Sequence, residues 1–575
     1  MPTLYLDNFN IVCATLGGFI TLFGLVSYLC KETFYLSEPL ISLVAGVVFS
    51  PHAANLIRPF EYAQGHEETL EVITLYFTRL VLGVQLVLAG IQLPHKYLKK
   101  EWKSLAFLLG PVMTTMWIVT SLLIFALVPK ISFLHALAVG ACVTPTDPVL
   151  SNSIVKGKFA DKNIPKDLQR IIIAESGAND GLGYPFLFLP LFLILHTGYG
   201  GLGQDNSAGH AVGKWFYETW GYTIILSVVY GGIVGWLAKE LLHWAEERKY
   251  VDRESFLVHA ITLALFIVGT MGMLGSDDVL ACFIAGNTFT WDDWFRRETK
   301  DDSLQPTIDM LLNVSVFIWF GAVCPWSAFV HNHVIPVYRL IPLGILVLLL
   351  RRPPIVWLLH RKIHQIEETK QAVFVGFFGP IGVSAIFYLY LSLEFLNHIT
   401  VDGEVRPDAE YLKEVMMVVI WFLVICSIII HGLTIPLGKL GFYLPRTISE
   451  ALSRERDGET TPAFHVDDSE ESRIGGSSAT RIRRIGRSII RSNRSSLSIS
   501  RSSTRPHPLS LNQTPATTQE LGARSTRPPS PTPNVSTDQL AAMEASGKLE
   551  EPQLGPRTIR FPDEVHIDGD GKYGA

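Results

Sequence analysis

The sequence predicts an all-α membrane protein in which about 13 transmembrane helices precede a disordered C-terminal tail. The chain of 575 residues has a mean hydropathy of +0.28 and only 18% charged residues, too apolar for an ordinary soluble protein. Apolar runs follow one another up to about residue 440 and then stop. Since a membrane-spanning helix needs about 20 apolar residues, runs of this length predict membrane spans.

Hydropathy read over windows of about 19 residues divides the apolar part into spans. The short ninth span is the weakest assignment, and 12 spans are the alternative to about 13. No basic residues precede the first run, which predicts a membrane span and not a cleaved secretory signal. The predicted spans are residues 10–29, 36–56, 71–93, 104–128, 132–155, 168–195, 217–239, 256–275, 277–291, 306–328, 335–360, 371–393 and 413–438.

Basic residues alternate between the loops. The loop after span three carries Lys96, Lys99, Lys100 and Lys103, whereas the loop after span two carries only Arg58. The loops after spans three, five, seven, nine and eleven are rich in Lys and Arg, and the even-numbered loops are poor in them. By the positive-inside rule, we expect the N-terminus outside and the C-terminal tail in the cytoplasm. This alternation favours 13 spans over 12.

Two spans are interrupted near their middle. Span five contains Thr144-Pro145-Thr146-Asp147-Pro148, and span twelve contains Gly379-Pro380-Ile381-Gly382. The two spans are seven apart, so they cross the membrane in opposite directions, which is typical of an inverted-repeat transporter with its site at the crossing. The alternative is that the prolines only kink two helices. The matched spacing and the acidic Asp147 favour the crossing.

Span six carries Glu175-Ser176-Gly-Ala-Asn179-Asp180 at membrane depth, where charged groups are costly and usually functional. Ser176 and Asp180 are four apart and share a helix face, while Glu175 and Asn179 lie about 100° away. We expect Asp180 and Ser176 to face a cation path, with Glu175 and Asn179 facing a structural partner.

Arg352 is the predicted partner of Glu175, because a buried ion pair satisfies both groups. It lies in Arg351-Arg352-Pro353-Pro354, inside or near the end of span eleven. The alternative is that Arg352 is an interfacial cation that snorkels to the membrane surface. Arg351 is predicted to snorkel. The acidic pairs at Asp277 and Asp292 are expected to cap helices or to lie in solvated loops.

The oxygen-rich set predicts a cation and proton site. Asp180, Asp147, Ser176, Thr146 and Thr144 offer carboxylate, hydroxyl and carbonyl oxygens, which suit Na+, Li+ or K+. Protons and cations would compete for Asp180, which is sufficient for exchange. We expect no cofactor and no enzymatic activity, and no clustered thiolate or imidazole for a transition metal. The alternatives are a cation channel, a sensor that signals through the tail, and an intramembrane hydrolase using Ser176 and Asp180 without a histidine.

These motifs resemble the fungal plasma-membrane sodium(potassium)/proton antiporters, which belong with the NhaP-type cation/proton antiporters. The resemblance covers residues 8–445 and also includes Gly275-Ser276-Asp277-Asp278. It implies a homodimer with dimerisation and core subdomains within residues 1–445, an antiporter fold and a plasma-membrane location. It also implies that Asp180, Ser176, Asp147 and Thr146 bind the cation, and that Glu175, Asn179 and Arg352 support them.

Residues 446–575 lose hydrophobic periodicity and are predicted to be a disordered cytoplasmic regulatory tail. The basic segment Arg481 to Arg491 carries isoleucines on one helical side and could lie on an anionic leaflet, or be a solvated linker. Phosphorylation at Ser488, Ser495 or Ser496 would weaken a membrane contact. Kinase, phosphatase or anionic-lipid contacts are expected of this tail, and no nucleic acid.

Overall fold

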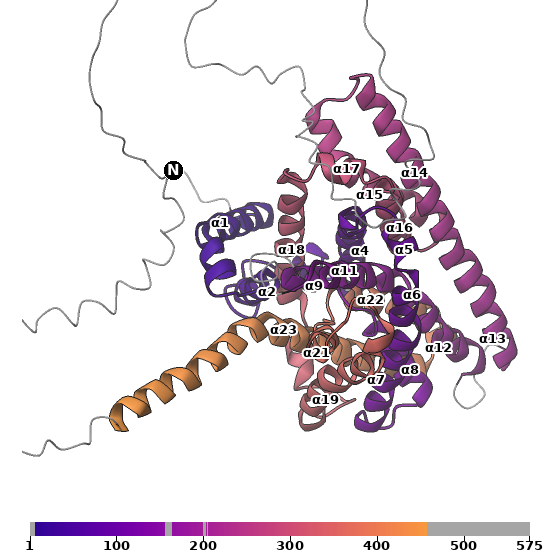
Figure 1. Ribbon diagram of the computed structural model, residues 1–575. Coiled ribbons are helices and arrows are strands. Elements are labelled where there is room, and N and C mark those ends of the chain that lie inside the picture. The colour runs from indigo at the N-terminus through magenta and orange to yellow at the C-terminus, as the bar shows by residue number, and fades with distance from the viewer. Residues whose placement is uncertain (1–5, 156–163, 199–202, 204, 457–575) are drawn as a thin grey trace, which may run out of the picture. The chain divides into compact units, whose positions relative to one another are not determined.

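The computed structural model describes residues 6–155, 164–198, 203 and 205–456, and most of them are helical (Figure 1). A two-stranded antiparallel hairpin, β1 (Thr400–Val401) and β2 (Glu404–Val405), precedes the last helix. The tail predictions at Ser488, Ser495, Ser496 and the Arg481 to Arg491 segment lie outside the described residues.

Within the described part of the chain, nine helical stretches are long and apolar enough to span a membrane, and four further apolar helices are shorter. Together they fall one for one on the 13 predicted spans. The long stretches are α1 (Asn8–Tyr28), α4 (Glu67–Gln92), α6 (Trp102–Phe107) with α7 (Met113–Leu127), α11 (Lys166–Gly181) with α12 (Gly183–Thr197), α13 (Ala208–Lys214) with η3 (Trp215–Ile225) and α14 (Leu226–Glu247), α15 (Arg253–Leu274), α18 (Leu304–Val323), α19 (Val337–Leu350) with α20 (Pro353–Leu359), and α23 (Pro407–Arg456). The shorter ones are α2 (Glu38–Phe49), α8 (Phe133–Cys142), α16 (Asp278–Phe289) and α22 (Val383–Asn397).

Both predicted interruptions are present. Span five consists of α8 and α9 (Pro148–Val155), and span twelve consists of α21 (Thr369–Phe377) and α22. Pro148 begins α9, a position where its missing N–H costs no helical hydrogen bond. A third interruption, between α19 and α20, was not predicted. It falls at Arg351 and Arg352, because Pro353 disfavours a continuous helix through the residue before it.

Two helix ends differ from the prediction. Helix α2 ends at Phe49 and not near residue 56, since Pro51 follows and Asn55 adopts a left-handed conformation with φ of 54°. Helix α23 continues to Arg456, past the predicted end of the membrane part at residue 445. No glycine or proline lies between Arg446 and Arg456, so the backbone has no local reason to stop there.

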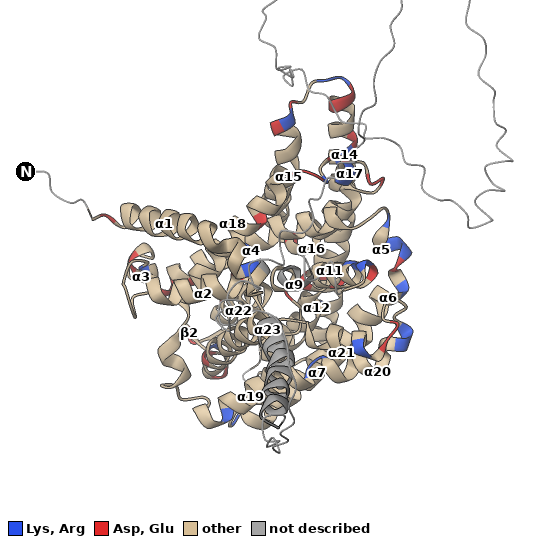
Figure 2. Cartoon of the chain, turned by 60° about the vertical axis from the view of Figure 1, so that its left-hand side comes forward, with Lys and Arg blue, Asp and Glu red and all other residues tan. Residues whose placement is uncertain are grey.

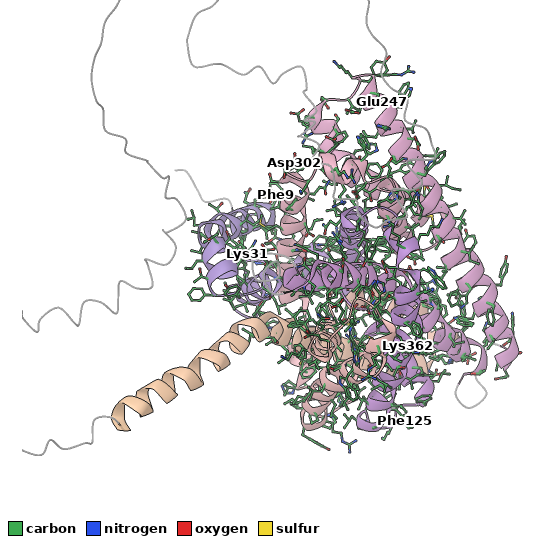
Figure 3. The ribbon with its side chains drawn as sticks, in the orientation of Figure 1. Phe9, Lys31, Phe125, Glu247, Asp302 and Lys362 are labelled. Atoms are coloured by element: carbon green, nitrogen blue, oxygen red, sulfur yellow. The ribbon has the colours of Figure 1, made fainter. Side chains whose placement is uncertain are left out.

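Charged and apolar side chains are distributed as in a membrane protein. Most of the helical ribbon carries no charged residue, and Lys, Arg, Asp and Glu gather at helix ends such as those of α5 (Tyr97–Lys100) and α6 (Figure 2). Phe9 and Phe125 are 71% and 47% exposed and lie on the periphery of the bundle (Figure 3). An apolar exterior around buried charged groups fits a lipid surrounding.

Glycines bring α4 and α16 together in the middle of the bundle. Helix α16 packs on α4, α14, α15 and α11, and α8 packs on α7, α12 and α22. A Cβ on Gly286 would lie 2.3 Å from the carbonyl oxygen of Val87, and one on Gly90 would lie 2.7 Å from the backbone N of Asn287. Close backbone approach of this kind is how small residues hold membrane helices together.

We expect Gly286→Ala to destabilise the protein, because the added methyl group meets backbone that cannot rotate away. Overpacking of this kind costs about 1–3 kcal/mol. Thermal unfolding in detergent, followed by intrinsic fluorescence, should give a lower midpoint for this variant. Gly269→Ala is the matched control, since a Cβ there meets nothing within 4 Å. Equal midpoints for the two variants would contradict close packing of α4 on α16.

Candidate functional site

The two interrupted spans touch each other directly at their breaks. The backbone N–H of Asp147 donates to the carbonyl of Pro380 at 3.0 Å. Each break frees backbone donors and acceptors, and at membrane depth such groups need partners within the protein. The structure supplies these partners from charged and polar side chains of neighbouring helices, which together form the candidate site.

Asp147 is fully buried and joins the N-terminal ends of two half-helices. Its Oδ1 accepts the N–H of Val149 in α9 at 2.9 Å, and its Oδ2 accepts the N–H of Val383 in α22 at 2.7 Å. A negative charge at two positive helix ends is electrostatically favourable. A Cβ on Gly382 would lie only 1.6 Å from Oδ2, so this position accommodates glycine alone.

Arg351 joins the opposite ends of the same spans. Its guanidinium donates to the carbonyl of Val143, just after α8, and to the carbonyl of Gly379, just after α21. The prediction that Arg351 snorkels is wrong, because the residue is only 2% exposed. The reason is the break at α19, which places Arg351 beside carbonyls that carry the negative ends of α8 and α21.

Glu175 and Arg352 form a bidentate ion pair, at 2.6 and 2.8 Å, and each residue is 2% exposed. The Nε of Arg352 donates to the carbonyl of Val375 in α21 at 3.0 Å. The ion pair expected from the sequence is therefore present. It connects α11 to the interrupted span twelve through the start of α20.

Asn179 contacts the first break and not the Glu175 pair. Its Nδ2 donates to Thr146 Oγ1 at 2.7 Å, and its Oδ1 accepts the N–H of Thr146 at 3.1 Å. The hydroxyl of Ser176 lies 3.3 Å from those of Thr146 and Ser151. The hydroxyl of Thr144 donates to the carbonyl of Gly140 at 2.7 Å, one turn earlier in the chain. Of the two predicted threonines, Thr146 is thus the one within this hydroxyl cluster.

Asp180 differs from the other charged groups at the crossing. It is 0% exposed, and neither carboxylate oxygen has a hydrogen-bond partner among the described residues. The hydroxyl of Ser384 in α22 is likewise buried and has no hydrogen-bond partner among the described residues. The Tyr388 hydroxyl donates to the main-chain carbonyl of Asp180 and so fixes the backbone. A buried carboxylate without partners is a candidate binding group for a cation or a proton.

Polar residues of α23 complete the second break, and the sequence analysis did not single them out. The Ser427 hydroxyl accepts the N–H of Ile381 at 2.7 Å, and His431 Nε2 donates to the carbonyl of Phe377 at 3.0 Å. These residues are four apart in an apolar span, so they share one helix face. That spacing is the signal that could have identified them.

The acids at the start of α16 are buried in the bundle. Asp277 Oδ1 caps α16 by accepting the N–H of Leu280 at 3.1 Å, as expected, but its other oxygen is buried without a partner. Asp278 forms an ion pair with Arg79 at 2.7 Å and is 2% exposed, so the expectation that it lies in a solvated loop is wrong. The isolated Arg79 inside apolar span three is the signal for such a partner.

The fold and the site together define a class of protein. An all-helical membrane bundle with two interrupted helices that meet beside a buried, unpartnered carboxylate is the architecture of an inverted-repeat secondary transporter. A sequence model described as sodium/hydrogen exchanger, transmembrane, matches residues 18–437. The chain belongs to the sodium/hydrogen exchanger family and is a multi-pass membrane protein.

Known relatives share much of this chain. It is 38% identical over 457 residues to a probable Na+/H+ antiporter of Schizosaccharomyces pombe, covering 78% of this chain and 58% of the relative. It is 37% identical over 451 residues to a Na+/H+ antiporter of Saccharomyces cerevisiae, covering 77% and 44%. The chain thus spans about half the length of these two relatives. The solved structure of a sodium proton antiporter from Methanocaldococcus jannaschii covers 75% of this chain and 98% of its own, at 17% identity and a TM-score of 0.52, which supports the fold.

We expect Glu175→Gln to destabilise the protein by about 3–5 kcal/mol, because it leaves the Arg352 guanidinium buried without a compensating charge. The midpoint of thermal unfolding in detergent should fall accordingly. Glu367→Gln, an exposed change of the same chemistry, serves as the control. If Glu175→Gln unfolds at the wild-type temperature, the ion pair does not support the bundle.

Proposed function

We propose that the chain is a secondary active antiporter that exports Na+ in exchange for H+. Li+ and K+ are further cations that it transports. One observation carries this proposal: the carboxylate of Asp180 is buried at the crossing of two interrupted helices with both oxygens unpartnered. The names of the relatives, which are Na+/H+ antiporters, support the same reaction.

The mechanism follows from the cost of an isolated buried charge. An unpaired carboxylate in the membrane is expensive, and either a proton or an alkali cation removes that cost. The two ligands compete for one group, so the site changes sides readily when occupied and resists moving when empty. Alternating access of such a site exchanges the cation on one side for the proton on the other.

The surrounding oxygens suit a small hard cation. We infer that Ser176 and Thr146 supply neutral hydroxyl or carbonyl oxygens beside Asp180, while Glu175, Asn179 and Arg352 hold the helices in place. Asp147 would contribute its negative charge to the cation site, and Thr144 would contribute its main-chain carbonyl oxygen. The glycines and prolines of the breaks, Pro145, Pro148, Gly379, Pro380 and Gly382, allow the backbone to open there.

Orientation and assembly are part of the same proposal. The basic loops support an outside N-terminus and a cytoplasmic tail. The resemblance to fungal antiporters supports a homodimer at the plasma membrane, with dimerisation and core subdomains within residues 1–445 and a regulatory tail at 446–575. The separate packing of α16 with α4 and α14, and of α8 with α7 and α12, is compatible with two such subdomains.

Asp180→Asn should abolish exchange, because the amide accepts neither a proton nor the charge of a cation. Purified protein in liposomes with an imposed pH gradient and an internal pH dye measures this directly. Addition of Na+, Li+ or K+ in turn should collapse the gradient for the wild type and leave it intact for the variant. The order of the three cations gives the selectivity.

Asp301→Asn is the matched control, since Asp301 is an exposed loop residue. It should exchange like the wild type. A working Asp180→Asn variant would remove Asp180 from the mechanism. A flux that ignores the pH gradient would favour a cation channel over an antiporter.

Truncation before residue 457 separates an antiporter from a sensor that signals through the tail. The truncated chain keeps every helix named above, so we expect at least about half of the wild-type exchange rate in the liposome assay. Full-length protein reconstituted at the same density is the reference. Loss of all exchange on truncation, with an unchanged unfolding midpoint, would show that the tail is part of the transport machinery.

A further inference from the structure

Two histidines and an aspartate meet where α12 ends and α13 begins. His196 Nδ1 lies 3.0 Å from Asp205 Oδ1, and His210 Nδ1 contacts Asp205 Oδ2. The two imidazole rings have centroids 4.6 Å apart. The ligand atoms of the three residues all lie within 4.8 Å of one another. The sequence analysis expected no clustered imidazoles, because His196 and His210 are separated by a loop whose closure it did not predict.

The loop ends are fixed by hydrogen bonds that do not involve the imidazoles. The N–H of Asn206 donates to the carbonyl of His196 at 2.9 Å, and the Ser207 hydroxyl caps α13 by accepting the N–H of His210 at 3.2 Å. His196 is 3% exposed, and its Nε2 has no hydrogen-bond partner among the described residues. The proposed ligands therefore come from α12, which holds the buried His196, from Asp205 just before α13, and from His210 within α13.

We propose that His196, Asp205 and His210 bind a divalent transition metal ion of the Zn²⁺ class. Two imidazole nitrogens and one carboxylate oxygen are typical ligands of Zn²⁺, with bonds of about 2.0–2.2 Å. Such bonds in a tetrahedron hold the ligand atoms roughly 3.4 Å apart. The ligand atoms now lie within 4.8 Å of one another, and a bound metal would replace the protons that the imidazoles share with the carboxylate. The fourth position is left for water.

The electrostatics of the cluster suit a cation. An aspartate carboxyl in water titrates at about 3.9, so Asp205, which contacts both imidazoles, brings a negative charge to the cluster at neutral pH. Lys214 lines the same hollow, but its ammonium lies 3.6 Å from Glu218 and over the ring of Phe192. The nearby positive charge is thus already engaged.

A metal here would restrain the helix that carries the transport site. Helix α12 continues from α11, which holds Asp180, while α13 leads through η3 into α14, and α14 packs on α16. Coordination by His196 and His210 cross-links these two stretches. In the proposed orientation the loop after span six faces outside. We therefore infer that external Zn²⁺ slows exchange. This inference rests on the proposed antiport function, whereas the proposal that the metal binds does not.

Binding is tested on untagged, metal-free full-length protein titrated with Co²⁺, whose visible absorption reports tetrahedral coordination. We expect one Co²⁺ per chain, displaced by Zn²⁺. His210→Ala and Asp205→Asn should each weaken binding at least about tenfold. His331→Ala, which removes an exposed histidine elsewhere, should bind like the wild type. His210 is 61% exposed in its side chain, so its loss leaves folding intact. Equal Co²⁺ binding by wild type and His210→Ala overturns the site.

The consequence for transport is tested separately in liposomes by adding Zn²⁺ on one side at a time. External Zn²⁺ should reduce Na+-driven collapse of the pH gradient for the wild type and for His331→Ala, but not for His210→Ala. Metal binding without inhibition of exchange would contradict the inference that the metal restrains transport, but it would still support the metal site. Failure of the exchange assay without any metal, alongside normal Co²⁺ binding, would count against the antiport function alone.

Discussion

Four helix ends meet inside the bundle, and two opposite charges satisfy them. Asp147 accepts backbone N–H groups from α9 and α22, and Arg351 donates to carbonyls that follow α8 and α21. In the membrane each unpaired backbone group costs several kcal/mol, and each half-helix adds its dipole to that cost. The interruptions are compatible with a folded bundle because both charges are in place, and the site exists only because the helices are interrupted.

A second buried pair fixes α11, the helix that carries Asp180. Two short hydrogen bonds join Glu175 in α11 to Arg352 at the start of α20, and Arg352 Nε donates to the carbonyl of Val375 in α21. Asn179 holds α11 against Thr146. Residues 175, 179 and 180 lie within little more than one turn of α11. These two contacts fix the helix around Asp180, whose carboxylate oxygens have no hydrogen-bond partner among the described residues.

Local patterns were sufficient to predict the spans, both proline breaks and the Glu175–Arg352 pair. The length of an apolar run predicts a span, a proline within it predicts a break, and two opposite charges inside spans predict an ion pair. The role of Arg351 was not predictable in this way. Whether an arginine beside Pro353 reaches solvent or turns inward depends on the carbonyls of two distant breaks. Arg79, Ser427 and His431 left local signals, a lone arginine in an apolar span and two polar residues four apart, but their partners depend on tertiary packing.

Charge balance at the crossing distinguishes its carboxylates. Asp147 is offset by helix ends, and Glu175 by the guanidinium of Arg352, so neither can give up its partners without exposing other buried groups. The buried Asp277 uses one oxygen to cap α16 through Leu280. The carboxylate of Asp180 has no hydrogen-bond partner among the described residues, so its negative charge remains to be neutralised at the crossing. We infer that a site with one uncompensated negative charge accepts one proton or one monovalent cation at a time, which is the competition that exchange requires.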